Sequence, residues 1–158
     1  CDDLWKKNKI ELQLKFMKQS NFIFSFTSYD IIDENNNFIK CRKAPHYLDF
    51  KKLRNSCDIG LSTVMVKKSI FKNDEYEFAN LRTKEDYVLW LKLARDKTIM
   101  KSMKQSLTSW RKNKNSLSSS FIQKIIDGYR VYRVYLKYNR LKSLYCLVIL
   151  SINFILKN

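Results

Sequence analysis

The segment "NFIFSFTSYDII" (residues 21–32) constrains the fold most, because phenylalanines at alternate positions give it the period of two that a strand has. Segments with a helical period surround it. Residues 6–20 place Ile10, Leu14 and Met17 on one expected face, with lysines elsewhere, and residues 83–95 form a second helical pattern. Alternation of helices with a few strands predicts an α/β fold.

The helix at 83–95 carries a start signal, and five other elements are expected along the chain. In "TKEDYVLWLKLAR", Thr83 is a candidate N-cap, and Asp86 three residues later has the spacing of a capping box. The others are a returning strand at 38–40, a short helix in "YLDFKKLRNS", a buried strand at Ser62–Val66, and two C-terminal helices at 120–140 and 142–156.

The charge of +16 is unevenly distributed. Residues 1–96 carry 18 basic and 14 acidic side chains, whereas residues 97–158 carry 13 basic side chains and one acid, Asp127. Such a segment repels itself unless it meets an anion, and nucleic acid, anionic lipid or a phosphorylated substrate would each serve. The helix at 120–140 mixes tyrosines with cations, and the apolar segment directly after it favours a membrane surface over nucleic acid.

The cysteines argue against a zinc site. The four of them (Cys1, Cys41, Cys57 and Cys146) have no metal-type spacing, and His46 is the one histidine. We expect free thiols in a reducing cytoplasm. The longest apolar run, from Leu144 to Leu156, is shorter than the roughly 20 residues of a membrane-spanning helix, so a surface-lying or core helix is expected.

Two acidic pairs are candidates for chemistry. Asp2 and Asp3 precede the first helix, where carboxylates offset the helix dipole, but they can also be oxygen ligands for Mg²⁺ or Mn²⁺ beside a diphosphate. Glu85 and Asp86 begin a helix, where Asp86 is either a capping residue or a general base for an incoming hydroxyl. The basic stretch "WRKNKNSLSS" (110–119) is either a solvated loop or a phosphate clamp that includes Arg111.

Taken in order, five stretches resemble family 2 glycosyltransferases with the GT-A fold, of the kind that build bacterial surface polysaccharides. The stretches are "DDLWKKNKIELQLKFM", "FSFTSYDIIDENNNFI", "IGLSTVMVKKSIF", "LRTKEDYVLWLKLA" and "SWRKNKNSLSS". The first resembles the end of the family's metal-binding acidic motif and the helix after it. The fourth resembles the family's Glu-Asp motif at a helix start. Trp110 stands where Tyr is commoner, and Cys1 stands where small residues are usual.

The resemblance implies roles for particular residues. Asp2 would bind the Mn²⁺ or Mg²⁺ cofactor, with Asp3 as the adjacent acid, and Asp86 would be the catalytic base, with Glu85 beside it. Arg111 would reach the diphosphate of the donor. The implied reaction is an inverting transfer of a sugar from a nucleotide-diphosphate sugar to a hydroxyl of a glycan or lipid-linked acceptor.

The resemblance also predicts the organisation of the chain. Residues 1–119 would be the acceptor-side half of a GT-A domain with a Rossmann-like mixed sheet, and residues 120–158 would be basic, aromatic and apolar C-terminal helices. Nothing in the chain resembles the nucleotide-binding half of the family, so the fragment alone is expected to be inactive. We expect peripheral contact with the inner face of the cell membrane through residues 120–158. The alternative is a basic binding module without catalysis, for membrane or nucleic acid.

Overall fold

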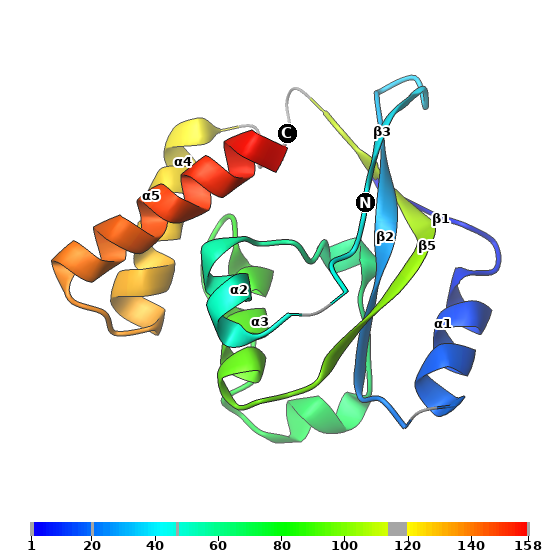
Figure 1. Ribbon diagram of the computed structural model, residues 1–158, viewed down its shortest axis with the longest axis horizontal. Coiled ribbons are helices and arrows are strands. Elements are labelled where there is room, and N and C mark those ends of the chain that lie inside the picture. The colour runs from blue at the N-terminus through cyan, green and yellow to red at the C-terminus, as the bar shows by residue number, and fades with distance from the viewer. Residues whose placement is uncertain (1, 20, 47, 114–119, 158) are drawn as a thin grey trace. The chain divides into compact units, whose positions relative to one another are not determined.

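A five-stranded mixed sheet brings together segments from residues 4–111 (Figure 1). Its strands run in the order β1-β5-β2-β3, and β4 also pairs with β2. Strands β2 and β5 are parallel, and all other pairs are antiparallel. The bounds are β1 Leu4–Trp5, β2 Phe24–Ile32, β3 Phe38–Arg42, β4 Met65–Val66 and β5 Met100–Arg111. The α/β class and the expected strands at 21–32 and 38–40 are therefore confirmed.

The computed structural model describes residues 2–19, 21–46, 48–113 and 120–157. Residue contacts divide the chain into two units built from non-contiguous segments. The sheet unit comprises Cys1–Leu48, Asp58–Asp74 and Thr98–Lys114. The helical unit comprises Asp49–Cys57, Glu75–Lys97 and Asn115–Asn158. The boundary at 119/120 remains a prediction about the family's domain, and each unit is described below by itself.

Strand β2 lies in the core of the sheet unit, where paired strands flank both of its edges. Its first five residues, Phe24 to Ser28, are all buried, so both faces of the strand are covered there. At its start β2 pairs with β4, and at its end with β3, while β5 runs along the other edge. A strand buried on both faces needs apolar or hydrogen-bonded side chains at every position, which explains why Ser25 and Thr27 sit between phenylalanines.

Helix α1 (Lys9–Gln19) buries a different face from the one expected. Ile10 is 55% exposed and Leu14 is also exposed, whereas Lys9, Gln13 and Met17 are buried. The Gln13 Nε2 amide lies within 3.2 Å of the Ser25 carbonyl and hydroxyl oxygens and the Thr63 carbonyl oxygen, and its Oε1 accepts from Lys9 Nζ at 2.8 Å. The predicted apolar stripe is therefore right for Met17 and wrong for Ile10 and Leu14, because hydrogen-bonded polar side chains occupy the rest of the contact.

The helical unit has four main helical elements. They are α2 Phe50–Asn55, α3 Glu85–Arg95, α4 Phe121–Arg130 continued by the π-helix η4 Val131–Tyr135, and α5 Arg140–Lys157. In its core the Tyr87 and Tyr132 hydroxyls lie 3.3 Å apart and both reach the Arg54 carbonyl oxygen, at 2.8 and 2.7 Å. Burial raises the pKa of both tyrosines, so they remain neutral hydrogen-bond donors. The expected short helix and both C-terminal helices are confirmed.

Two sequence-based expectations about local structure are wrong. The strand expected at Ser62–Val66 is reduced to β4, because the 3-10 helix η1 (Leu61–Thr63) takes up its first residues; a second, η2 (Lys68–Lys72), follows β4. Thr83 does not cap α3. The N-cap is Lys84, with φ of 65° and no side-chain cap, because the Thr83 backbone N–H and hydroxyl donate to Asp127 instead.

Two expectations about the whole chain can be checked directly. Cys41, Cys57 and Cys146 are free thiols, as predicted, and Cys1 lies outside the described residues. Within the described parts of the chain, no helix combines the length and apolarity needed to cross a membrane.

Replacing Gln13 with Ala is expected to destabilise the sheet unit by about 2–4 kcal/mol, because buried acceptors and the Lys9 ammonium lose their partner. Urea unfolding of the chain measures this loss. The matched control is Ile10→Ala on the exposed face of the same helix, expected to cost less than about 1 kcal/mol. Equal losses in the two variants would contradict the assignment of the buried face.

Candidate functional site

Asp2 and Asp3 lie at the carboxyl edge of the parallel strand pair. They directly precede β1, which is antiparallel to β5 with Leu4 opposite Ser109, so they reach the end of β5. Strand β2 ends at the same edge, with Ile32 opposite Arg111. In open α/β sheets this edge is where ligands bind. The first acidic pair is therefore at a position suited to a binding site.

Arg111 holds this edge together. Its backbone N–H donates to Asp3 Oδ1 at 3.2 Å, and its Nε donates to the Asp2 carbonyl oxygen at 3.1 Å. Its Nη1 contacts the carbonyl oxygens of Asp33 and Glu34, and its Nη2 donates to Asn36 Oδ1 at 2.7 Å. The guanidinium thus ties the Asp2 backbone to the β2–β3 turn, while the Arg111 backbone N–H holds the Asp3 carboxylate. Its role as a diphosphate ligand stays a prediction, and the structure shows a positioning role for the same side chain.

The two carboxylates suit a hard cation whose remaining ligands are waters or substrate phosphates. Asp2 is exposed, and its Oδ2 accepts from Asn113 Nδ2 at 2.7 Å; Asp3 is partly exposed and accepts through Oδ1. Mg²⁺ in proteins is commonly held by one or two carboxylates plus waters and substrate phosphates. No group of three or more His, Cys, Asp or Glu able to hold a metal occurs among the described residues. The described residues therefore offer a two-carboxylate edge and no complete cage.

The second acidic pair begins α3 in the helical unit. Glu85 and Asp86 are the first two residues of the helix and are both partly buried. Asp86 Oδ1 accepts from the backbone N–H of Tyr87 at 2.7 Å. A carboxylate here faces the positive end of the helix dipole, which stabilises negative charge. The expectation that both acids lie at a helix start is confirmed.

The pKa of Asp86 is raised to about 6. Desolvation by burial is the largest cause, and the negative charge of Glu85 adds to it; the Tyr87 N–H, Lys84 and Trp90 act in the opposite direction. A carboxyl group with such a pKa is ionised at neutral pH and still basic enough to accept a proton from a substrate. Perturbed carboxylates of this kind are concentrated at functional sites. The raised pKa is compatible with a general base, and that role stays a prediction.

Asp127 on α4 positions the start of α3. It is completely buried, and its Oδ2 accepts from the Thr83 N–H at 2.9 Å, the Thr83 hydroxyl at 3.0 Å and Gln123 Nε2 at 2.9 Å. Its Oδ1 lies 3.6 Å from Arg130 Nη1. Burial raises its pKa, but the bonds from Gln123 and Thr83, with Arg130, outweigh burial and lower it. Asp127 therefore fixes the turn at Thr83–Lys84 that leads into Asp86.

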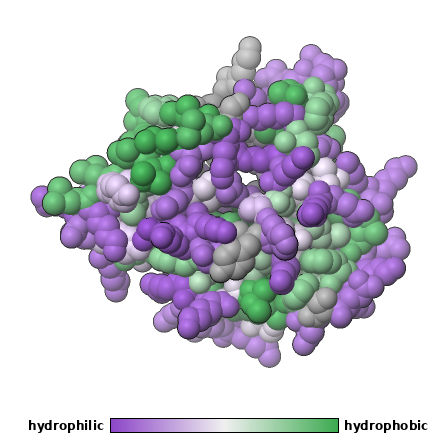
Figure 2. Space-filling view, in the orientation of Figure 1, coloured by the Kyte–Doolittle hydropathy of each residue, from purple (hydrophilic) through white to green (hydrophobic). Residues whose placement is uncertain are grey.

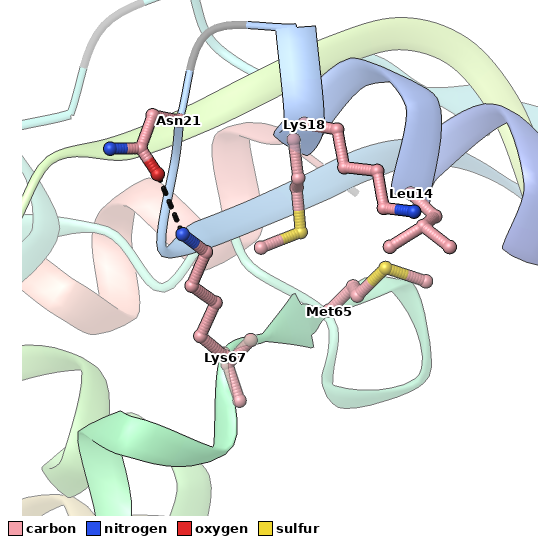
Figure 3. Close-up of a pocket in the computed structure, with 7 residues that line it drawn as sticks. Leu14, Lys18, Asn21, Met65 and Lys67 are labelled. Carbon is pink, nitrogen blue, oxygen red and sulfur yellow. Dashed lines mark hydrogen bonds between the residues drawn. The ribbon is translucent and has the colours of Figure 1, made fainter.

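A shallow pocket in the sheet unit is a separate feature (Figure 3). Its volume is about 370 Å³, and Lys67 Nζ donates to Asn21 Oδ1 across its rim at 2.7 Å. The lining residues are Leu14, Met17, Lys18, Asn21, Met65, Val66 and Lys67. None of the candidate site residues lines it.

The structure groups the predicted site residues in two sets. Asp2, Asp3 and Arg111 come together in the sheet unit, and Glu85 and Asp86 in the helical unit. The implied reaction requires the two sets to act on one donor and acceptor, and that convergence stays a prediction. Residues 114–119 of the stretch predicted as a phosphate clamp lie outside the described residues. Sequence reasoning missed Asp127, although a lone acid in a basic segment was the available signal.

Comparison with known proteins identifies relatives. The chain is 30% identical over 148 residues to the putative teichuronic acid biosynthesis glycosyltransferase TuaG of Bacillus subtilis, covering 93% of this chain and 58% of TuaG. It is 35% identical over 98 residues to the Escherichia coli UDP-Glc:alpha-D-GlcNAc-diphosphoundecaprenol beta-1,3-glucosyltransferase WfgD, covering 62% of this chain and 37% of WfgD. The chain is a relative of bacterial glycosyltransferases. The resemblance to surface-polysaccharide enzymes is thus confirmed.

Two further comparisons concern the fold and the family of this glycosyltransferase relative. The crystal structure of S. aureus TarS residues 1–349 with UDP-GlcNAc matches it with a TM-score of 0.60 at 16% identity, over 97% of this chain and 45% of the TarS chain. The mixed-sheet α/β fold expected from the resemblance is therefore confirmed. No protein-family model matches the chain. The chain spans little more than half of TuaG and a smaller part of WfgD.

Asp86→Asn is expected to stabilise this glycosyltransferase relative at pH 7 by at most about 3 kcal/mol, since one pKa unit corresponds to about 1.4 kcal/mol. A raised folded pKa means that the native state holds the proton more tightly, so ionisation costs stability as pH rises from about 4 to 6. The gain should vanish as pH falls through that window. Urea unfolding between pH 4 and 8 measures it. Asp74→Asn in an exposed turn is the matched control, and a gain independent of pH would contradict the assignment.

Asp127→Ala is expected to cost about 3 kcal/mol or more, because two buried donors of Thr83 and the partly buried amide of Gln123 lose one shared acceptor. Asp127→Asn keeps an acceptor oxygen and should cost less. Urea unfolding gives the order, and hydrogen exchange of the Thr83 amide should accelerate in both variants. An Ala variant as stable as the wild type, with a still protected Thr83 amide, would refute the positioning role.

Proposed function

We propose that the protein carrying this chain is a metal-dependent, inverting glycosyltransferase of family 2. The observation that carries the proposal is Asp86, a partly buried carboxylate with a pKa of about 6 at the start of α3, within the stretch that resembles the family's Glu-Asp motif. Two facts support it: the identity to TuaG and WfgD, and the fold shared with TarS.

In the proposed reaction, Asp86 accepts the proton of the acceptor hydroxyl as the oxygen attacks the anomeric carbon of the donor sugar. The new bond joins the acceptor oxygen to that carbon, and the bond from the same carbon to the diphosphate oxygen breaks. Attack opposite the leaving group inverts the configuration. Glu85 keeps the pKa of Asp86 high through its negative charge, which makes Asp86 a stronger base.

Asp2 is the proposed ligand of Mn²⁺ or Mg²⁺, with Asp3 beside it. Such a cation, when bound, supplies positive charge to the departing diphosphate. The roles of the chain's own residues are to present the two carboxylates at the sheet edge and to hold them there through Arg111. Because Asp2 is exposed and Asp3 only partly exposed, Asp2 is the better candidate for direct coordination.

We propose a nucleotide-diphosphate sugar as the donor and a glycan or lipid-linked acceptor. TarS is crystallised with UDP-GlcNAc, and the name of WfgD gives UDP-Glc as donor and a sugar diphosphoundecaprenol as acceptor. An acceptor carried on a lipid requires the enzyme at a membrane. We therefore also propose peripheral contact with the inner face of the cell membrane through residues 120–158.

Transfer assays on the protein as the cell makes it test the proposal. Asp86→Asn is expected to lower kcat by 10²–10⁴-fold with little change in donor KM, as for loss of a general base. Asp2→Ala is expected to raise the Mn²⁺ concentration for half-maximal turnover at least about tenfold.

Two exposed controls match these variants. Asp74→Asn and Glu11→Gln change charge at positions away from either acidic pair, and turnover should stay within about twofold of the wild type. Full activity in Asp86→Asn would eliminate Asp86 as the base. Unaltered metal dependence in Asp2→Ala would separately remove the metal assignment.

A further inference from the structure

Helix α5 is apolar on two opposite sides. One side is buried in the helical unit through Ser143, Cys146, Leu147 and Leu150. The other side carries an exposed stripe, and Figure 2 shows hydrophobic residues gathered over this helix and α4. We call it the outer stripe; its members are Leu141, Leu144, Tyr145, Val148, Ile152 and Ile155. Spacings of three and four residues place these side chains on one helical face.

The exposure of the outer stripe is large for a helix with a packed inner side. Leu141 is 80% exposed and Ile155 70%, and even Val148, near the middle of the helix, is 53% exposed. Helix α4 adds Phe121 and Ile122, each 70% exposed. Contiguous exposed apolar surface of this kind marks a site of interaction with another molecule or a membrane.

Exposed cations gather where α5 begins. Arg133, Lys137, Arg140 and Lys142 are all exposed, and the Lys142 ammonium lies 4.0 Å from the centre of the Tyr138 ring. Residues 120–158 hold seven basic residues and one acid, Asp127, which is buried and near Arg130. The surface charge of this segment is therefore strongly positive. It complements an anionic partner and repels a second copy of itself.

We infer that the outer stripe of α5 inserts into an anionic lipid surface, with the helix lying in the plane of the membrane. The helix is not long and apolar enough to cross a bilayer. A helix with an apolar face and cations at its margin instead rests at the boundary between headgroups and acyl chains. Arg133, Lys137, Arg140 and Lys142 meet the headgroup phosphates, and Tyr145 lies at the boundary.

This inference deepens the proposed function, because it places the chain where a lipid-linked acceptor would lie. Only this statement about the acceptor rests on the proposed function; the inferred contact with lipid does not. Vesicle binding needs no turnover, so a failure of binding and a failure of catalysis are distinguishable.

Flotation of the 158-residue chain with extruded vesicles tests the inference. The chain should float with phosphatidylcholine vesicles that contain 30% phosphatidylglycerol and remain below with pure phosphatidylcholine. Val148→Ser with Ile152→Ser should weaken binding by about tenfold or more, because two apolar side chains no longer enter the lipid. Arg133→Gln with Lys137→Gln should weaken it about fivefold per cation, and 0.5 M NaCl should reproduce that loss.

The matched control changes exposed apolar residues of the sheet unit. Phe38→Ser with Ile39→Ser, on β3, removes side chains that are 64% and 48% exposed, and vesicle binding should be unchanged. A second measurement keeps the apolar character of the position. Brominated lipids should quench the fluorescence of the indole introduced by Val148→Trp and should not quench that of the indole introduced by Phe38→Trp. Circular dichroism and thermal melting show whether each variant is folded.

Three outcomes would overturn the inference. One is equal binding to charged and neutral vesicles. Another is wild-type binding by the folded Val148→Ser, Ile152→Ser variant, without quenching of the Val148→Trp indole. The third is an absence of vesicle binding, together with a dimer in sedimentation velocity that this serine variant dissociates, which would assign the outer stripe to a second copy of the chain.

Discussion

The parallel pairing of β2 with β5 is the constraint on which the sheet unit depends. The two strands are separated by more than sixty residues of chain, yet their register runs from Phe24 opposite Met100 to Ile32 opposite Arg111. Parallel strands need a long crossover between them, and here that crossover includes α2 and α3. Because the strands point the same way, their carboxyl ends share one edge. Arg111 stands at that edge and binds Asp2, Asp3 and the β2–β3 turn.

Both units bury polar groups at the points that set their geometry. Gln13 joins α1 to the first residues of β2 and to η1, and Asp127 joins α4 to the turn before α3. A buried amide or carboxylate is stable only when its hydrogen bonds are made, so each fixes the distance and orientation of the segments that it links. Asp127 also gives the basic C-terminal segment a role within the fold, since it holds the residues that lead into Asp86.

The ionised carboxylate of Asp86 lowers the stability of the native state. Its ionised form is desolvated and faces the charge of Glu85, so the native state would be more stable with a neutral group there. Asp127 shows the opposite case, because bonds from Thr83 and Gln123 lower its pKa in spite of burial. The contrast separates an acid that stabilises the structure from one that does not. It agrees with the proposed role of Asp86 as a base and with a structural role for Asp127.

The sequence by itself determined the α/β class, the segments at 21–32, 38–40, 120–140 and 142–156, and the relation to bacterial glycosyltransferases, because period and motif order are local properties. Only the tertiary structure decided which face of α1 is buried, that Thr83 turns to Asp127 instead of capping α3, and that Arg111 holds Asp2. Each of these depends on a hydrogen-bond partner distant in the sequence. A local sequence pattern shows where apolar residues recur, but it does not show where a buried polar side chain finds its hydrogen-bond partner.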